Sequence, residues 1–124
     1  MAAALVVDDS RAVRMLLAKT LRGAGFEVTE AGTGLEALEA LDGPLETVDL
    51  ILTDWNMPAM NGLDLLKAIR SRPRFGSTPV IMITTETEME QMALALEAGA
   101  NEYVMKPFTQ EILLDKLRMA GVRV

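Results

Sequence analysis

Short apolar runs alternate with longer amphipathic stretches along the whole sequence. The short runs span residues 3–7, 26–31, 49–53, 80–83 and 102–105. Runs of this length indicate buried β-strands, whereas apolar residues that recur every three or four positions indicate helices. Strands that alternate with helices are joined by right-handed crossovers and form a parallel sheet covered on both faces. We therefore predict an α/β fold with a doubly wound, five-stranded parallel sheet in the order 2-1-3-4-5 and five helices.

Residues that commonly cap helices stand before the helical stretches. These predicted N-caps are Ser10, Thr33, Asn61, Thr87 and Thr109. Gly23 and Gly25 are predicted to end the first helix. Its predicted apolar face comprises Val13, Leu16, Leu17, Thr20 and Leu21. Since no linker or internal repeat divides the chain, residues 1–124 are expected to form one domain, without a separate effector domain.

The residue types that are missing exclude several kinds of site. The chain has no cysteine, which excludes disulfides and thiolate metal sites, and no histidine, which excludes the commonest general base and zinc ligand. Its net charge of −6 argues against nonspecific nucleic-acid binding. The apolar run that ends at Val7 is too short to span a membrane and lacks the pattern of a signal peptide. We therefore expect a cytoplasmic protein that binds neither nucleic acid nor membranes.

Polar side chains stand where the predicted strands end. Asp8 and Asp9 follow the first strand, whereas Asp54 ends the third, Thr84 ends the fourth and Lys106 ends the fifth. Because the first and third strands are neighbours in the predicted order, three carboxylates converge at the switch point of the sheet. Two negative charges about 4 Å apart repel by roughly 4 kcal/mol at an effective dielectric constant of about 20. The cluster is therefore expected to bind a cation.

The available ligands limit the choice of cation. With oxygen ligands only, a hard cation is favoured, and Mg²⁺ fits because it binds carboxylates and keeps waters that a phosphate can replace. A carboxylate beside Mg²⁺, with Lys106 and the Thr84 hydroxyl nearby, is equipped to accept a phosphoryl group, and Asp54 is the candidate nucleophile. Taken singly, such an aspartate is more often a turn former, Thr84 a helix cap and Lys106 a solvated charge. Only their joint occurrence indicates chemistry.

Four motifs carry a resemblance to a known family. They are Val7-Asp8-Asp9-Ser10-Arg11, residues 53–58 with Gly62, Ile83-Thr84, and Lys106-Pro107-Phe108. With these motifs, essentially the whole chain resembles the receiver domains of two-component response regulators, and among them the CheY-like single-domain chemotaxis regulators. The resemblance implies that residues 1–124 form a receiver (response regulatory) domain that phosphorylation activates, without turnover of an external substrate.

The resemblance also implies a role for each site residue. Asp54 accepts the phosphoryl group from a sensor histidine kinase. The implied Mg²⁺ ligands are Asp8, partly through water, Asp9, Asp54 and the backbone carbonyl of Asn56. Lys106 contacts the phosphoryl group, and its bond to Pro107 is expected to be cis. The side chains of Asn56 and Glu86 tune the access of the hydrolytic water.

A switch and a partner surface are implied as well. When Asp54 is phosphorylated, the Thr84 hydroxyl is drawn inward and the Tyr103 ring follows, which shifts a pre-existing equilibrium. The partner surface includes Met92, Tyr103 and Lys116, although periodicity alone favours a core position for Met92. The expected partners are the histidine kinase and an output protein such as the flagellar motor switch protein. The unphosphorylated chain is expected to be a monomer.

Three other functions remain open. The first is a stand-alone receiver that serves as a phosphate sink or relay outside chemotaxis, which fits the acidic residues in 86–90 where the chemotaxis regulators carry lysines. The second is an aspartyl-phosphate hydrolase, but Asn56 stands where such an enzyme needs a second acid. The third is a flavin site, but Asp8 and Asp9 would repel a phosphate unless a metal intervened.

Overall fold

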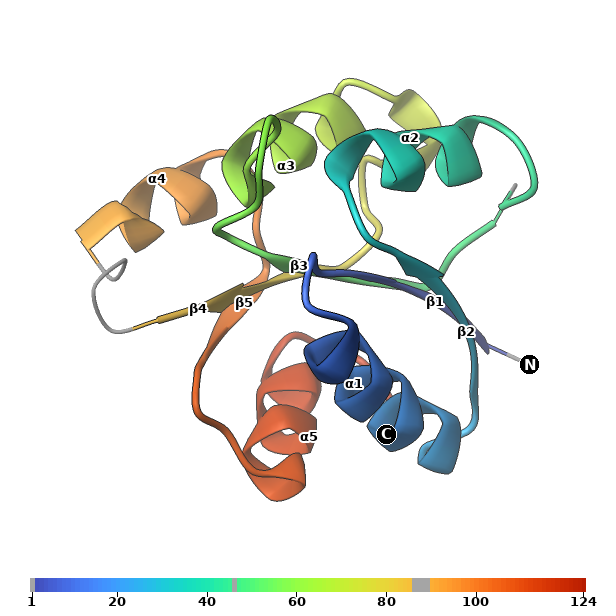
Figure 1. Cartoon of the computed structure of the whole chain (residues 1–124), viewed down its shortest axis with the longest axis vertical. Coiled ribbons are helices and arrows are strands. Elements are labelled where there is room, and N and C mark those ends of the chain that lie inside the picture. Colours follow the sequence, from blue (N-terminus) through green and yellow to red (C-terminus); the bar gives the residue numbers. More distant parts are fainter. Residues whose placement is uncertain (1, 46, 86–89) are drawn as a thin grey trace.

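The computed structural model describes residues 2–45, 47–85 and 90–124, which form a parallel sheet with helices between its strands (Figure 1). The strands are β1 (Ala2–Val7), β2 (Phe26–Ala31), β3 (Leu50–Asp54), β4 (Val80–Thr84) and β5 (Glu102–Met105). The helices are α1 (Arg11–Gly23), α2 (Gly34–Asp42), α3 (Gly62–Arg70), α4 (Met92–Glu97) and α5 (Gln110–Met119), with a short 3₁₀ turn, η1 (Pro73–Phe75). All neighbouring strands are parallel, in the order β2-β1-β3-β4-β5. The predicted fold and strand order are confirmed.

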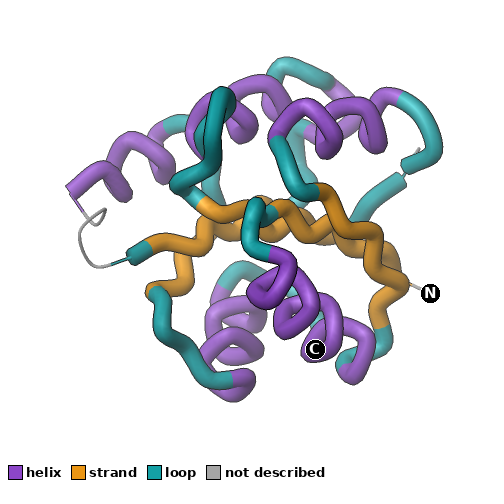
Figure 2. The backbone as a smooth tube through the Cα atoms, in the orientation of Figure 1, coloured by secondary structure: helices purple, strands orange, loops and turns teal. Residues whose placement is uncertain are grey.

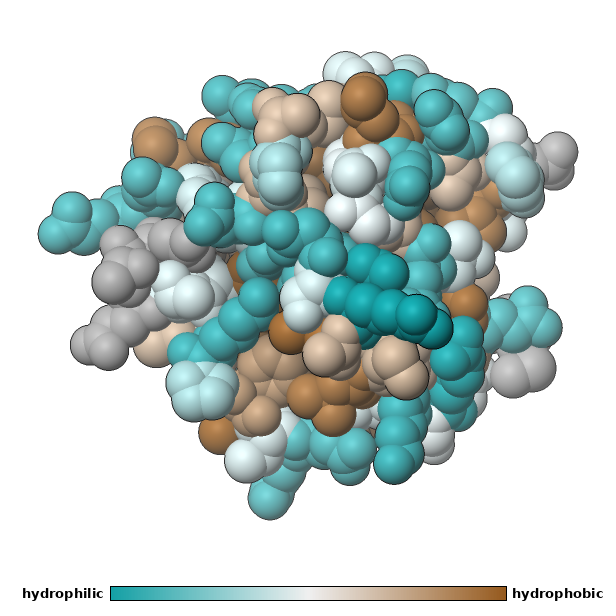
Figure 3. Space-filling model, viewed as in Figure 1, coloured by the Kyte–Doolittle hydropathy of each residue, from teal (hydrophilic) through white to brown (hydrophobic). Residues whose placement is uncertain are grey.

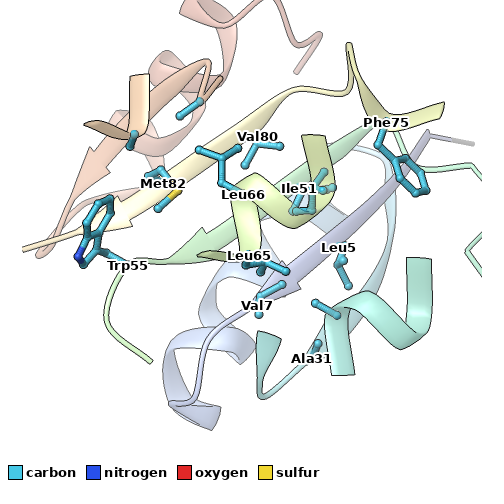
Figure 4. Packing of buried hydrophobic residues seen from close by; sticks show 14 of the residues in the cluster. Leu5, Val7, Ala31, Ile51, Trp55, Leu65, Leu66, Phe75, Val80 and Met82 are labelled. Atoms are coloured by element: carbon cyan, nitrogen blue, oxygen red, sulfur yellow. The ribbon is translucent and has the colours of Figure 1, made fainter. Parts of the chain in front are cut away.

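Helices cover both faces of the sheet (Figures 1 and 2). Helices α2, α3 and α4 lie on one face, and α1 and α5 lie on the other. Figure 4 shows the core of the first face, where Leu5, Ile51 and Val80 from three strands meet Leu65 and Leu66 of α3. The core of the second face includes Val6, Leu52, Ile81, Leu17 and Leu113. Successive strand residues thus supply opposite faces, as the two-residue period of a β-strand requires. None of the described helices is long and apolar enough to cross a membrane.

The helix starts follow the predicted caps. Four of these N-caps are confirmed: Ser10, Thr33, Asn61 and Thr109. In each, the side-chain oxygen accepts a hydrogen bond from the backbone N–H three residues further on, which satisfies a donor that the first turn leaves unpaired. The fifth predicted cap, Thr87, lies outside the described residues, and α4 begins at Met92. Helix α1 ends at Gly23, as predicted.

One detail of the predicted elements is wrong. Leu16 is not on the packed face of α1, since it is 45% exposed. Leu17 and Leu21 of this helix pack in the core against the sheet, whereas Leu16 lies outside that core. β3 ends at Asp54 and β4 at Thr84, as predicted for these two residues, one residue beyond the apolar runs 49–53 and 80–83. The sheet therefore holds the backbone of both residues directly, which fixes the positions of their side chains.

Gly62, the first residue of α3, lies against the end of β3. A Cβ atom here would clash with the Asp54 carbonyl oxygen and stand 2.7 Å from Met82 Cε. Because the carbonyl belongs to the sheet and cannot easily move, we expect Gly62→Ala to lower the free energy of unfolding by about 2 kcal/mol, measured by urea denaturation. Gly23→Ala is the matched control, since a Cβ there meets nothing within 4 Å. Equal stabilities for the two variants would contradict this packing.

Candidate functional site

The strand register brings three carboxylates together at the carboxyl edge of the sheet. Val7 stands opposite Thr53, so Asp8 and Asp54 occupy the next positions of two neighbouring chain segments. Asp9 follows Asp8 at the rim. One ligand oxygen from each aspartate lies within 4.8 Å of the others. The predicted meeting of the three carboxylates is confirmed. Figure 3 shows that hydrophilic side chains gather across the middle of this view, between the two helical layers.

The three aspartates differ in their exposure. Asp8 is fully buried and Asp54 is 5% exposed, whereas Asp9 is exposed. The Oδ1 atom of Asp8 accepts a hydrogen bond from the Ser10 backbone N–H at 2.8 Å, which fixes the start of the loop that leads to α1. A carboxylate buried in this way is costly unless hydrogen bonds or cations compensate its charge. The site therefore requires positive charge close to Asp8 and Asp54.

Lys106 supplies part of this charge. Its Nζ donates to Asp54 Oδ1 at 3.1 Å and to Asp8 Oδ2 at 3.3 Å. Its backbone N–H donates to the Thr84 carbonyl at 2.6 Å, so the lysine leaves the sheet at the same edge as the aspartates. The Lys106–Pro107 peptide bond is cis, which confirms the expectation from the family resemblance. One ammonium group thus bridges the two buried carboxylates.

The site shifts the protonation of its own groups. Burial and, to a smaller extent, the charge of Asp8 raise the pKa of Asp54, and Lys106 opposes both effects; together they place the pKa at about 6. Burial lowers the pKa of Lys106, but the charges of Asp54 and Asp8 outweigh burial and hold its pKa above the ordinary value. Asp54 is therefore ionised at neutral pH only at a cost, and a second cation would reduce that cost.

Thr84 and Asn56 flank the cluster. Thr84 is fully buried at the end of β4, and its hydroxyl donates to the Thr85 carbonyl at 3.3 Å. Asn56 is exposed in the loop after β3, two residues beyond Asp54. Glu86, the second residue expected to tune hydrolysis, lies outside the described residues. Thr84 therefore lies at the same edge of the sheet as the aspartates. The role of the Asn56 side chain in tuning hydrolysis stays a prediction.

The residues expected on the partner surface have different surroundings. Met92 is 3% exposed and packs in the core beneath α4, the position that its periodicity favours. Tyr103 is partly buried against the same core. Lys116 projects from α5 with its Nζ 4.4 Å from the centroid of the Tyr103 ring. Tyr103 and Lys116 are thus in contact and accessible, whereas Met92 is not available to a partner in this conformation.

Two contributors to this region have only weak signals in the sequence. The Nη1 atom of Arg14 donates to the Asp8 carbonyl at 2.7 Å, and its Nε lies 3.4 Å from Glu30 on β2. Glu102 pairs with Lys116 at 3.6 Å. The position of Arg14, one turn after the cap Ser10, places it beside the loop that carries Asp8. That spacing could have indicated the contact with the Asp8 carbonyl, whereas nothing local indicates the Glu102 pair.

The donor set fits Mg²⁺. Three carboxylates within reach of one another, with oxygen ligands only, suit a hard divalent cation, and the single ammonium of Lys106 does not balance three negative charges. Asp8, Asp9 and Asp54 would hold the ion, and the exposed side of the site leaves room for its waters. A metal-binding acidic cluster is therefore compatible with the structure.

Comparisons with known proteins define the class. Residues 4–118 match the model of the response regulator receiver domain. The chain is 50% identical over 116 residues to chemotaxis protein CheY1 of Helicobacter pylori, which covers 93% of each chain. It is 42% identical over 121 residues to chemotaxis protein CheY of Pseudomonas aeruginosa, which covers 97% of this chain and 96% of that protein. The solved structure of Vibrio cholerae chemotaxis protein CheY4 superposes with a TM-score of 0.88 at 39% identity, covering 97% and 98% of the two chains.

The chain belongs to the response regulator receiver domain family. Within that family it is a two-component response regulator with a CheY-like receiver domain, as its similarity to several chemotaxis proteins shows. The family resemblance of the sequence is thus confirmed. Proteins of this class are in general signalling proteins, not enzymes.

The raised pKa of Asp54 makes stability depend on pH. The pKa of its carboxyl is 3.8 in the unfolded chain and about 6 in the folded protein. The contribution of Asp54 to the free energy of unfolding therefore falls as the pH rises between these values and is constant above them. Asp54→Asn removes the cost of burying an ionised carboxylate at this position. We expect the variant to be more stable than the wild type at pH 8 by up to about 3 kcal/mol without divalent cations, with the difference vanishing towards pH 4. Urea denaturation at both pH values measures it.

Millimolar Mg²⁺ provides the control for this experiment. Because the cation favours the ionised carboxylate, Mg²⁺ at pH 8 should stabilise the wild type and narrow its difference from Asp54→Asn. A variant that is no more stable than the wild type at pH 8 without Mg²⁺ would contradict the buried charge at Asp54.

Proposed function

We propose that Asp54 accepts a phosphoryl group from a sensor histidine kinase and that the modified protein then binds an output protein. The observation that carries this proposal is the buried Asp54 carboxylate, which Lys106 contacts at 3.1 Å in a cluster with two further aspartates. An oxygen of Asp54 attacks phosphorus and forms a P–O bond, and the P–N bond to the kinase imidazole breaks. The transfer therefore needs an ionised Asp54 and positive charge around it.

Each neighbouring residue has a proposed part in this transfer. The Lys106 ammonium stabilises the charge on the phosphoryl oxygens, and the Thr84 hydroxyl donates a hydrogen bond to one of them. Asp8, Asp9 and Asp54, with the backbone carbonyl of Asn56, hold Mg²⁺, which supplies further positive charge when bound. Access of water to the product is tuned by the side chains of Asn56 and Glu86. No external substrate is turned over.

The strand register supports a switch built from Thr84 and Tyr103. Tyr103 stands opposite Met82 in the β4–β5 pair, and Thr84 follows Met82 by two residues. Since residues two apart share a face, Thr84 and Tyr103 lie diagonally on the same face of adjacent strands. A Thr84 hydroxyl that moves towards the phosphoryl group would leave space for the Tyr103 ring to move inward. We propose this coupled movement as the conformational change.

The proposed output surface is formed by α4, β5 and α5, with Tyr103 and Lys116 as its described accessible members. The relatives are named chemotaxis proteins, which supports the flagellar motor switch protein as the output partner. The receiver domain acts as a cytoplasmic monomer before phosphorylation and works through this partner.

Trp55 offers a direct probe of the site, because it follows Asp54 and is the only tryptophan. Beryllofluoride mimics a phosphoryl group on aspartate. We expect beryllofluoride with Mg²⁺ to quench the Trp55 fluorescence of the wild type and to leave Asp54→Asn unchanged. Asp115→Asn is the matched control, since it makes the same chemical change at an exposed position on α5 and should respond as the wild type does. An equal response of Asp54→Asn would reject Asp54 as the acceptor.

The output partner is tested separately. Protein treated with beryllofluoride and Mg²⁺ should be retained on immobilised flagellar motor switch protein more strongly than untreated protein. Retention that does not change with treatment would reject the flagellar motor switch protein as the output partner. It would not affect the proposal that Asp54 is phosphorylated.

A further inference from the structure

Lys116 contacts two consecutive residues of β5. Its Nζ lies 4.4 Å from the centroid of the Tyr103 ring and 3.6 Å from Glu102 Oε1. The same Glu102 oxygen accepts a hydrogen bond from the Tyr103 backbone N–H at 3.0 Å. One carboxylate therefore ties the lysine to the backbone of the residue whose ring that lysine covers.

These contacts lie where β5 meets the helices of both layers. β5 is an edge strand, with α4 and α5 on opposite faces of the sheet (Figure 1). The Tyr103 ring packs against the core on the α4 side, whereas Lys116 reaches it from α5 on the other side. The ring thus lies at the edge of the sheet, in contact with both layers. A cation held over its face restrains the ring from the α5 side.

The pair is sheltered enough for this restraint to matter. The side chains of Lys116 and Glu102 are only 26% and 17% exposed, so solvent screens their attraction less than that of a fully exposed pair. A cation over an aromatic ring is attracted by the electrons of the ring face, and the attraction grows as water is removed. Glu102 holds the Lys116 ammonium in place, so the lysine side chain is already ordered where it contacts the Tyr103 ring.

We propose that Lys116 and Glu102 are positioning residues of the Tyr103 switch. They hold the ring in the partly exposed position seen here and oppose its inward movement. This inference rests on the proposed function, in which a phosphoryl group on Asp54 draws the ring inward. By linkage, a contact that favours one ring position weakens every ligand that favours the other. Loss of the Lys116 contact should therefore strengthen binding of a phosphoryl mimic at Asp54.

The chain is suited to test this idea because it has one tyrosine and one tryptophan. Trp55 fluorescence reports occupation of the Asp54 site. Tyr103 labelled as 3-fluorotyrosine gives a single ¹⁹F NMR signal that reports the surroundings of the ring. The two probes separate binding at Asp54 from movement of Tyr103.

The decisive variant is Lys116→Met, which keeps most of the side-chain volume and removes the charge. We expect it to bind beryllofluoride with Mg²⁺ about two- to fivefold more tightly than the wild type, the lower end of the range for a cation over an aromatic ring. Its ¹⁹F signal without ligand should lie closer to the ligand-bound signal of the wild type. Lys19→Met on α1 removes the same charge far from the ring and should match the wild type in both measurements.

Glu102→Gln tests the chain of contacts. It should shift both readouts in the same direction as Lys116→Met in the wild-type background and have no further effect in the Lys116→Met background. Unchanged or weaker mimic binding by Lys116→Met, or an equal effect of Lys19→Met, would overturn the inference. If the wild type itself does not respond to the mimic, the proposed function fails. If it responds and Lys116→Met does not differ from it, only this inference fails.

Discussion

The ion pairs that Lys106 makes with Asp54 and Asp8 are the interaction on which the site depends. Parallel strands of matched register leave two carboxylates buried side by side at the edge of the sheet, and they repel each other. Lys106 crosses from the end of β5 and bridges both. Its charge makes the cluster tolerable but does not neutralise it, because Asp9 adds a third negative charge. The remaining imbalance explains why the edge is suited to a divalent cation and to phosphoryl transfer.

The same lysine links the charged edge to the β4–β5 pair. Its backbone N–H donates a hydrogen bond to the Thr84 carbonyl. The Thr84 side chain lies on the same face of the sheet as Tyr103 on the next strand. A change of charge at Asp54 would therefore act first on Lys106, whose backbone is hydrogen-bonded to the end of β4. The contacts continue from Tyr103 to Lys116 on α5. The proposed switch residues Thr84 and Tyr103 thus lie between the acceptor and the proposed partner surface.

Much of the fold follows from local patterns in the sequence. The period of the apolar runs predicts the strands, the polar caps predict four helix starts, and the strand order brings Asp8 near Asp54. Periodicity alone also favours the buried position of Met92. The cis bond at Pro107 was implied by the family resemblance, and no pattern of spacing indicates it.

Features that depend on contacts between distant segments could not be predicted in this way. Leu16 is exposed because the apolar stripe of α1 is wider than the arc that the sheet covers. Likewise, Glu102 meets Lys116 only once α5 packs beside β5. Sequence reasoning thus identifies the charged groups of the site but not the partners that position them.

Chemical trapping of the phosphoryl group tests the central claim most directly. The protein is incubated with a small phosphodonor and Mg²⁺ and then reduced with borohydride, which converts an aspartyl phosphate to homoserine. Peptide mass spectrometry then locates the modified residue. The account predicts homoserine at Asp54 alone, dependent on Mg²⁺ and strongly reduced when Lys106 is replaced by methionine. Modification of Asp8 or Asp9 instead, or none at Asp54, would contradict it.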